Sequence, residues 1–142
     1  MLQLIYRSVA APGIDAGVAA RISEYSRQRN RSLEITGVLL FDQRNFVQVL
    51  EGGTNIVDLV FGQIQKDDRH SDVTLLSRIE KLERSFPYWS MQLSVVRTAY
   101  FEQPPWQNPQ FDAASPRFGK AISDVFRYQN RTELAQFEGR AV

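Results

Sequence analysis

Hydrophobic and polar residues alternate along the first part of the chain. Leu2, Leu4 and Tyr6 are each separated by one residue, and a period of two is typical of a β-strand with one face turned toward a core. From Asp15, a residue type that favours helix N-caps, apolar residues recur at three- and four-residue spacing. The pattern therefore predicts a strand followed by a helix that ends near Asn30.

The middle of the chain predicts a hairpin and a second helix. Apolar stretches at 36–41 and 46–50 flank the turn-forming residues 42–45, which indicates two strands joined by a tight turn. Two glycines then interrupt the second strand, and Thr54 or Asn55 is expected to cap the helix that follows. The apolar face of this helix consists of Ile56, Val60, Phe61 and Ile64.

The later part of the chain is less regular. Residues 73–82 fit a helix or a strand, and topology has to decide between them. Trp89 and Met91 begin an alternating pattern that predicts a strand with both side chains on one face. Residues 98–115 hold three of the six prolines and predict a linker or wrapping arm, and a final helix is expected to begin at Ser115.

The first 96 residues thus run strand, helix, strand, strand, helix, strand, strand. This order predicts an α+β fold, a ferredoxin-like βαββαβ sandwich with an additional fifth strand and two helices on one sheet face. A C-terminal helical extension completes it. In this topology the first and third strands are central neighbours, so we expect Tyr6 and Gln48 to lie side by side.

Composition narrows the classes of function. The 142 residues carry 17 Lys and Arg against 16 Asp and Glu, a net charge of +1, which argues against a nucleic-acid groove. The absence of cysteine and the single histidine exclude thiolate nucleophiles, disulfides and the usual metal sites. No signal peptide or membrane-spanning run is evident. We therefore expect a cytoplasmic protein with no metal, no nucleic-acid partner and no membrane segment.

Gln48 and Tyr6 are the first candidate functional residues. Gln48 has apolar neighbours on its strand, and an unpaired buried amide costs roughly 1–3 kcal/mol, so its side chain must find partners. A structural glutamine bonded to the backbone and a glutamine that recognises a polar ligand both satisfy this requirement, and Tyr6 has the same two interpretations. Together on neighbouring strands, the two residues favour a ligand between the sheet and the helices.

Polar clusters follow both predicted helices. Asn30 lies among three arginines at the end of the first helix, where cations stabilise the helix dipole without any further role. A second cluster follows the other helix, in either a solvated loop or the border of a binding site, and consists of Asp67, Arg69 and His70. Trp89 and Met91 fit a core, and they also fit packing against a planar ligand.

An ordered signature of Tyr6, Asn30, Gln48 and a Trp89-x-Met91 pair runs through residues 1–97. With the stretches around it, at 4–8, 35–40, 46–52, 67–70 and 86–91, it resembles the BLUF family, whose members are flavin-binding blue-light sensors. The resemblance implies a flavin-binding photosensor domain over 1–97 and a linker with a helical cap or output extension over 98–142.

The resemblance also implies a place for FAD, between the two helices with its ring directed at the sheet. Asn30 is then a donor to the carbonyl edge of the flavin. Gln48 bridges Tyr6 and the N5/O4 region, while Trp89 and Met91 compete for the place beside it. The implied cofactor-binding residues are Tyr6, Ile22, Arg29, Asn30, Leu39, Gln48, Ile64, Asp67, His70, Trp89 and Met91.

Two positions depart from patterns that are common in the family. Arg29 stands where another asparagine is frequent, and Gln63 stands where an arginine is frequent. These differences leave recognition of the flavin ring in place and change the side chains available to the phosphates. Arg29 is a possible replacement on the phosphate side.

The implied mechanism is photochemical rather than enzymatic. Light absorption by the oxidised flavin is followed by electron and proton transfer from Tyr6 and a rearranged hydrogen-bond network at Gln48, which gives a red-shifted signalling state. The change reaches the extension through Met91 or Trp89. Because the 45 residues at 98–142 are too few for a cyclase or phosphodiesterase, the implied output is a partner protein in trans, with a homodimer as the favoured assembly.

Two other functions fit the same predicted topology. One is a hydrolase of the acylphosphatase kind, although its glycine-rich phosphate loop after the first strand is missing here. The other is a regulatory domain that binds a ligand without photochemistry. An absorption spectrum separates the three.

Overall fold

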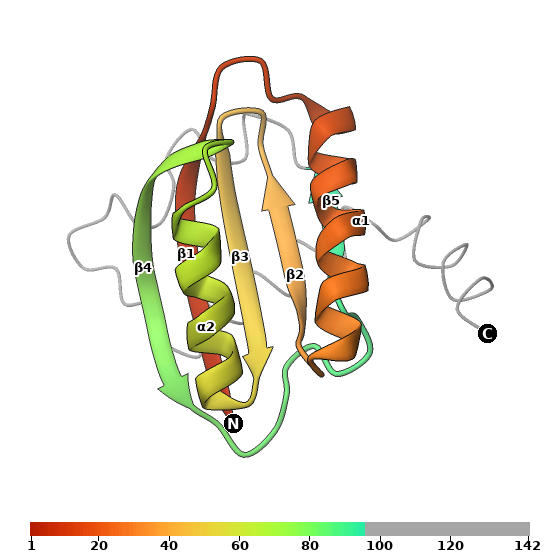
Figure 1. The fold of residues 1–142 in the computed structure, drawn as a ribbon, viewed down its shortest axis with the longest axis vertical. Coiled ribbons are helices and arrows are strands. Elements are labelled where there is room, and N and C mark those ends of the chain that lie inside the picture. The colour runs from red at the N-terminus through yellow and green to blue at the C-terminus, as the bar shows by residue number, and fades with distance from the viewer. Residues whose placement is uncertain (96–142) are drawn as a thin grey trace.

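Residues 1–95 are described by a computed structural model, as a five-stranded sheet with two helices on one face (Figure 1). The predicted extension at 98–142 lies outside the described residues. No helix within the described part is long and apolar enough to cross a membrane. The elements in chain order are β1 (Leu2–Ala10), α1 (Ala16–Ser32), β2 (Thr36–Phe41), β3 (Asn45–Gly52), α2 (Thr54–Gln65), β4 (His70–Glu80) and β5 (Gln92–Val95).

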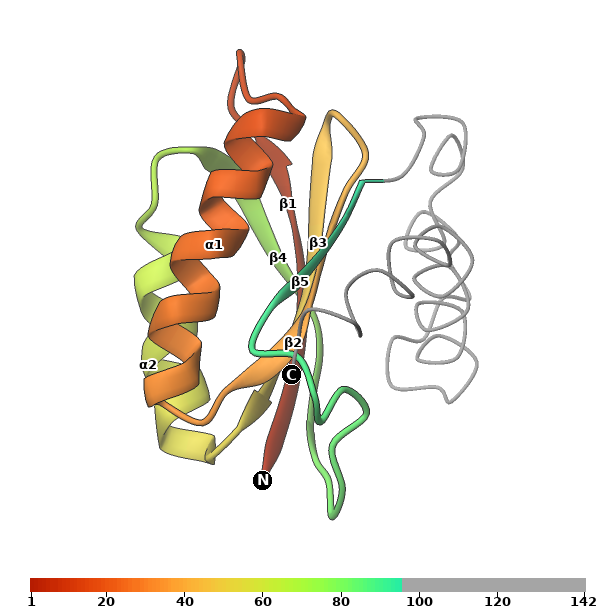
Figure 2. The same cartoon turned by 90° about the vertical axis from the view of Figure 1, so that its right-hand side faces the viewer.

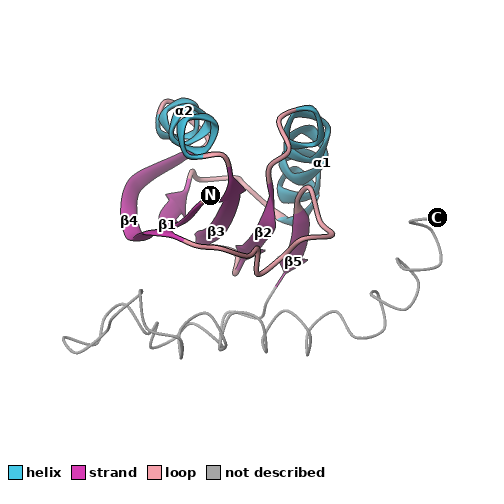
Figure 3. Ribbon diagram, turned by 90° about the horizontal axis from the view of Figure 1, so that it is seen from below, coloured by secondary structure: helices cyan, strands magenta, loops and turns pink. Residues whose placement is uncertain are grey.

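The sheet has the strand order β4-β1-β3-β2-β5, which confirms the predicted ferredoxin-like arrangement with a fifth strand. The first four strands pair antiparallel, and β5 adds to β2 in parallel. The β1–β3 register places Tyr6 opposite Gln48, as the topology predicted. Figures 2 and 3 show both helices on the same side of the sheet.

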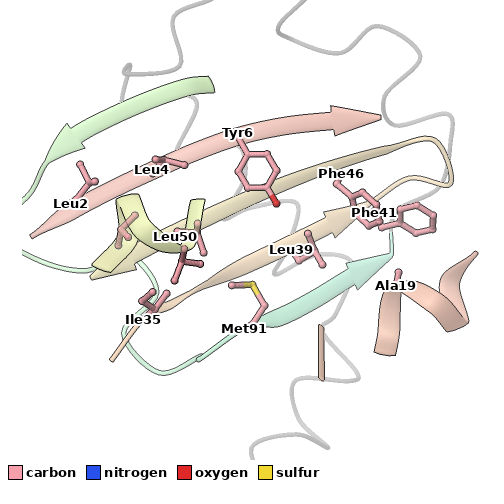
Figure 4. Packing of buried hydrophobic residues seen from close by; sticks show 12 residues of the cluster. Leu2, Leu4, Tyr6, Ala19, Ile35, Leu39, Phe41, Phe46, Leu50 and Met91 are labelled. Carbon is pink, nitrogen blue, oxygen red and sulfur yellow. The ribbon is translucent and has the colours of Figure 1, made fainter. Parts of the chain in front are cut away.

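Alternation along the strands divides the buried apolar residues between the two sheet faces. On the face covered by the helices, Tyr6, Leu39 and Met91 belong to one cluster (Figure 4). A second cluster on the opposite face contains Val38 and Val49. Since neighbours in sequence fall into different clusters, the strands contribute to a core on each side.

The two helices differ in how their N-termini are capped. The Asp15 side chain accepts a hydrogen bond from the Val18 amide at 2.9 Å, so Asp15 caps α1 as predicted. The prediction that Thr54 or Asn55 caps the second helix is wrong, because Gly53 is the N-cap and no side chain caps α2. The Thr54 hydroxyl instead donates to Glu80 Oε1 at 3.2 Å.

The ambiguous stretch at 73–82 is largely a strand. It lies in β4, whose pairing with β1 completes the hydrogen bonds of that strand. Because β4 is an edge strand, several of its side chains remain exposed. This exposure explains why its apolar pattern is too sparse to distinguish a strand from a helix.

The loop between β4 and β5 is anchored by a buried glutamate. The Glu51 carboxylate is fully buried and accepts hydrogen bonds from the backbone amides of Ser85, at 2.9 Å, and Phe86, at 2.7 Å. Gln3 Nε2 donates to the same carboxylate at 3.2 Å. These bonds fix the loop on the sheet face opposite the helices, a few residues before Met91.

Trp89 and Met91 do not share a face, and this prediction is wrong. Met91 belongs to the helix-side cluster, whereas Trp89 packs on the opposite side, with its ring centroid 6.3 Å from that of Phe86. The regular strand begins only at Gln92. Because residues 89–91 precede the strand, the alternation of a regular strand does not apply to them.

Gly37 is a position where the sheet leaves no space for a side chain. A Cβ built there would lie 1.8 Å from the Val49 carbonyl oxygen. We therefore expect Gly37→Ala to lower the free energy of unfolding by about 3 kcal/mol, through overpacking between β2 and β3. Urea denaturation measures the loss.

Gly62 in α2 provides the matched control for this prediction. A Cβ there meets nothing within 4 Å, and Gly is about 0.5–1 kcal/mol less stable than Ala inside a helix, so Gly62→Ala is expected to stabilise the protein. Equal stability of Gly37→Ala and the unsubstituted protein would contradict the close strand approach.

Candidate functional site

A cavity of about 300 Å³ lies between the two helices and is lined on the sheet side by residues of β1, β2 and β3. The strands contribute Tyr6, Leu39 and Gln48 to its floor, and α1 and the segment from the end of α2 into β4 contribute its walls. Eight residues of the predicted cofactor-binding set line it: Tyr6, Ile22, Arg29, Leu39, Gln48, Ile64, Asp67 and His70.

A chain of hydrogen bonds crosses the floor of the cavity from β1 to the start of β5. The Tyr6 hydroxyl donates to Gln48 Oε1, and Gln48 Nε2 donates to Met91 Sδ at 3.3 Å. All three residues are at most 3% exposed. Because a thioether sulfur only accepts hydrogen bonds, the Met91 contact fixes the amide with its nitrogen toward β5 and its oxygen toward Tyr6.

The Tyr6 hydroxyl is held in its protonated form. Burial raises the pKa of Tyr6 well above the usual tyrosine value, and the nearby Arg29 charge opposes part of this effect. The phenol ring lies 5.4 Å from the Phe61 ring and 6.4 Å from the His70 ring, between centroids. Tyr6 therefore keeps its proton at neutral pH and serves as a hydrogen-bond donor.

His70 is fixed by contacts at both ring nitrogens. Nε2 lies 2.6 Å from the Ile64 carbonyl oxygen, and Nδ1 lies 2.7 Å from Ser8 Oγ. A carbonyl oxygen can only accept, so Nε2 carries a hydrogen, and in the neutral ring Nδ1 accepts from the Ser8 hydroxyl. The ring orientation is thus set by β1 and the end of α2.

Asp67 and Arg69 form an ion pair among the lining residues that follow α2. Arg69 Nε donates to Asp67 Oδ1 at 2.9 Å and to Oδ2 at 3.1 Å, and the guanidinium also contacts Oδ2 through Nη2. The hydrogen bonds from Arg69 lower the pKa of Asp67 to about 2. The carboxylate is therefore charged at neutral pH and already paired.

This ion pair predicts a change in stability at acid pH. The pKa of Asp67 is about 2 in the fold against an ordinary 3.8, so its stabilisation is complete above pH 3.8 and is lost as the pH falls through about 2. Since the pair is partly exposed, we expect a contribution of about 1 kcal/mol at most. The measurement is urea denaturation from pH 7 to pH 2. The contribution of the ion pair is the difference in unfolding free energy between the unsubstituted protein and Asp67→Asn.

The matched variant is Arg69→Gln, which breaks the same pair from its other side. Its free energy of unfolding should fall less steeply with decreasing pH than that of the unsubstituted protein, as for Asp67→Asn. If the difference in unfolding free energy from the unsubstituted protein stays constant from pH 5 to pH 2 for both variants, the ion pair does not stabilise the fold.

Arg29 and Asn30 are joined at the end of α1. Arg29 Nε donates to Asn30 Oδ1 at 3.1 Å, and Asn30 Nδ2 donates to the Ser90 carbonyl at 3.0 Å. Arg29 lines the cavity, and its Nη2 atom is buried without a hydrogen-bond partner in the part of the chain that the structure describes. Asn30 is fully buried behind it. The cavity therefore has a buried cationic donor that requires an acceptor.

Three predicted cofactor residues are not among those lining the cavity. Asn30 lies behind Arg29, and Met91 lies behind the amide of Gln48. Trp89 lies on the far side of the sheet, in the cluster with Phe86. Met91 rather than Trp89 is therefore the residue beside Gln48.

Five further residues line the cavity but were absent from the predicted set: Tyr25, Ser26, Phe46, Gln63 and Arg69. Helical spacing is a signal for the first two, since Tyr25 and Ser26 lie three and four residues after Ile22 on one face of α1. Phe46 precedes Gln48 by two residues on the same strand face.

The described residues thus form an α+β sandwich with a cavity between its helices, floored by a buried tyrosine and glutamine. The cavity lining combines apolar side chains, such as Ile22, Leu39 and Ile64, with hydrogen-bonding groups from the strands and both helices, a mixture typical of small-molecule sites. The chain belongs to the BLUF family, "Sensors of blue-light using FAD", whose family model matches residues 1–92.

Individual relatives agree with this membership. The chain is 33% identical over 84 residues to photoactivated adenylate cyclase subunit beta of Euglena longa, covering 59% of this chain and 10% of that protein. It therefore spans about a tenth of the length of that curated relative.

Solved structures match over more of the chain. The dark-state structure of BlrB, a BLUF protein, has a TM-score of 0.70 and 28% identity, over 87% of this chain and 96% of that one. Klebsiella pneumoniae BlrP1 with FMN and cyclic diGMP has a TM-score of 0.64 and 31% identity, over 90% of this chain and 36% of that one.

Proposed function

We propose that this protein is a blue-light photoreceptor that binds FAD non-covalently in the cavity and acts without enzymatic turnover. The observation that carries the proposal is the hydrogen-bond chain from Tyr6 through Gln48 to Met91 on the cavity floor, in a member of the BLUF family. The cofactor supplies the absorption of blue light and a ring that accepts electrons.

The residues present fit a flavin. Ile22, Leu39 and Ile64 offer apolar side chains to a flat aromatic ring, and the buried Arg29 Nη2 requires an acceptor such as a ring carbonyl. Asn30 Nδ2 uses one hydrogen for the Ser90 carbonyl. Asn30 is fully buried outside the cavity lining, so in this arrangement it contributes by holding Arg29 through Oδ1, and the direct bond to the carbonyl edge that the family resemblance implies stays a prediction.

Tyr6 is proposed as the electron and proton donor of the light reaction. Its hydroxyl points at Gln48 Oε1, and its raised pKa keeps the proton in place in the dark. With flavin bound, Tyr6 would give up one electron and one proton to the excited ring and would take both back afterwards. The cycle therefore leaves no residue oxidised and needs no external reductant.

Gln48 is proposed to convert this transfer into a lasting change of hydrogen bonds. When Tyr6 loses its proton, it no longer donates to the amide oxygen, and the amide can rotate or tautomerise. Rotation turns Oε1 toward Met91 Sδ, where two acceptors face each other and the present bond is lost. The amide N–H would then be free to donate to an acceptor on a bound flavin, and a stronger hydrogen bond there would move the flavin absorption to longer wavelength.

Met91 is proposed to pass the change to the end of the photosensor domain. It directly precedes β5, and Arg27 Nε donates to its carbonyl at 3.1 Å. Loss of the Gln48 bond therefore loosens the start of β5. We propose that the sensor ends at residue 97 and that residues 98–142 relay the signal to a partner protein, with a homodimer as the assembly.

Reconstitution tests the proposed cofactor. The purified protein is expected to be yellow, and the flavin released on denaturation should be identified as FAD by chromatography. Titration of apoprotein with FAD, FMN and riboflavin compares the three directly. A protein that retains none of them under any condition would refute the proposed function.

A further inference from the structure

We propose that Arg29 raises the reduction potential of the bound flavin, with its guanidinium facing the pyrimidine edge of the flavin ring. This inference rests on the proposed function. Uptake of two electrons and one proton leaves a flavin ring with one negative charge, and charge placed near the ring tunes that equilibrium. An unpaired cation at the ring edge stabilises the reduced form.

The Arg29 side chain is held by neighbours yet has an unused donor. Nε is bound to Asn30 Oδ1 at 3.1 Å, and the guanidinium carbon lies 6.0 Å from the centroid of the Tyr25 ring. These contacts fix the plane of the guanidinium. Nη2 is left buried with no hydrogen-bond partner among residues 1–95, which costs free energy unless a ligand supplies an acceptor.

The positive charge of Arg29 is not neutralised within the described residues. The charged side chains that line the cavity are Arg29, Asp67 and Arg69, and Asp67 is engaged by Arg69 through three contacts. None of the ion pairs within residues 1–95 includes Arg29. Among the described lining residues, the Asp and Arg side chains therefore leave one unpaired positive charge, that of Arg29 on α1.

The location of Arg29 favours the ring over the phosphates. Arg29 is bonded to Asn30, and Asn30 to the carbonyl of Ser90, the residue before Met91. Met91 in turn contacts Gln48, so the guanidinium belongs to the same end of the cavity as the Tyr6–Gln48 pair. Mutual effects of Arg29 and Tyr6 on each other's pKa agree with this proximity.

Redox titration of the flavin-loaded protein with dithionite tests the proposal. We expect Arg29→Gln to lower the ratio of reduced to oxidised flavin at a fixed potential by about tenfold, a shift of about 30 mV for a two-electron couple. Arg29→Lys retains the charge and should keep most of the potential. Arg31→Gln removes the same charge from an exposed position of α1 and should have no effect, because solvent screens it.

Binding constants identify the part of the ligand that Arg29 faces. If it faces the ring, Arg29→Gln weakens riboflavin, FMN and FAD by a similar factor. A loss confined to FMN and FAD would assign Arg29 to the phosphates and overturn the proposal, as would an unchanged midpoint potential. These outcomes differ from failure of the proposed function, in which the unsubstituted protein itself retains no flavin.

Discussion

Tyr6→Phe is expected to abolish the light-induced red shift while the flavin remains bound. The substitution removes only the hydroxyl, which is the group that donates to Gln48 Oε1. Phenylalanine retains the ring that packs 5.4 Å from Phe61 but lacks the proton and is much harder to oxidise. Absorption spectra before and after blue illumination measure the effect.

Two further results make the Tyr6 prediction specific. Loss of the hydroxyl leaves a buried amide oxygen without its donor, so the free energy of unfolding should fall by about 1–3 kcal/mol. Tyr25→Phe is the matched control, because Tyr25 also lines the cavity but is 62% exposed, and it should keep the full red shift. A normal shift in Tyr6→Phe would exclude Tyr6 as the donor.

Gln48→Leu is expected to abolish the red shift as completely, for a different reason. Leucine fits the apolar surroundings of β3 but has neither an oxygen for Tyr6 nor an N–H for Met91. Electron transfer from Tyr6 can still occur, but no amide is present whose hydrogen bonds could change afterwards. Transient spectroscopy should show that the flavin returns to its dark spectrum without forming a red-shifted product.

Gln63→Leu is the matched control for this prediction, because Gln63 is a second glutamine of the cavity lining, on α2. It should retain the reversible red shift. If Gln48→Leu forms the same red-shifted state as the unsubstituted protein, the amide is not the group that changes.

The sequence predicted the strand neighbours at the centre of the site, and the physical reason is topology. Right-handed crossovers leave a gap between the first and second strands, and the third strand fills it. Tyr6 and Gln48 then fall opposite each other because both strands alternate with a period of two. No side-chain geometry is needed for that inference.

Features that depend on three-dimensional contacts could not be read in the same way. Trp89 was assigned to the wrong face because residues 89–91 are held individually through their carbonyls, by Gly37 N, Asn30 Nδ2 and Arg27 Nε, ahead of the regular strand. The hydrophobic and polar pattern of the sequence likewise does not predict the unpaired Nη2 of Arg29, since pairing depends on which acceptors the fold brings near.

A light-minus-dark absorption spectrum of the flavin-loaded protein tests the central claim most directly. If Tyr6 and Gln48 act as proposed, blue light moves the flavin bands to longer wavelength, and the original spectrum returns in the dark without added reductant or oxidant. A flavin-loaded protein whose spectrum is unchanged by illumination, or bleaches without recovery, would contradict the assignment of this chain as a blue-light sensor.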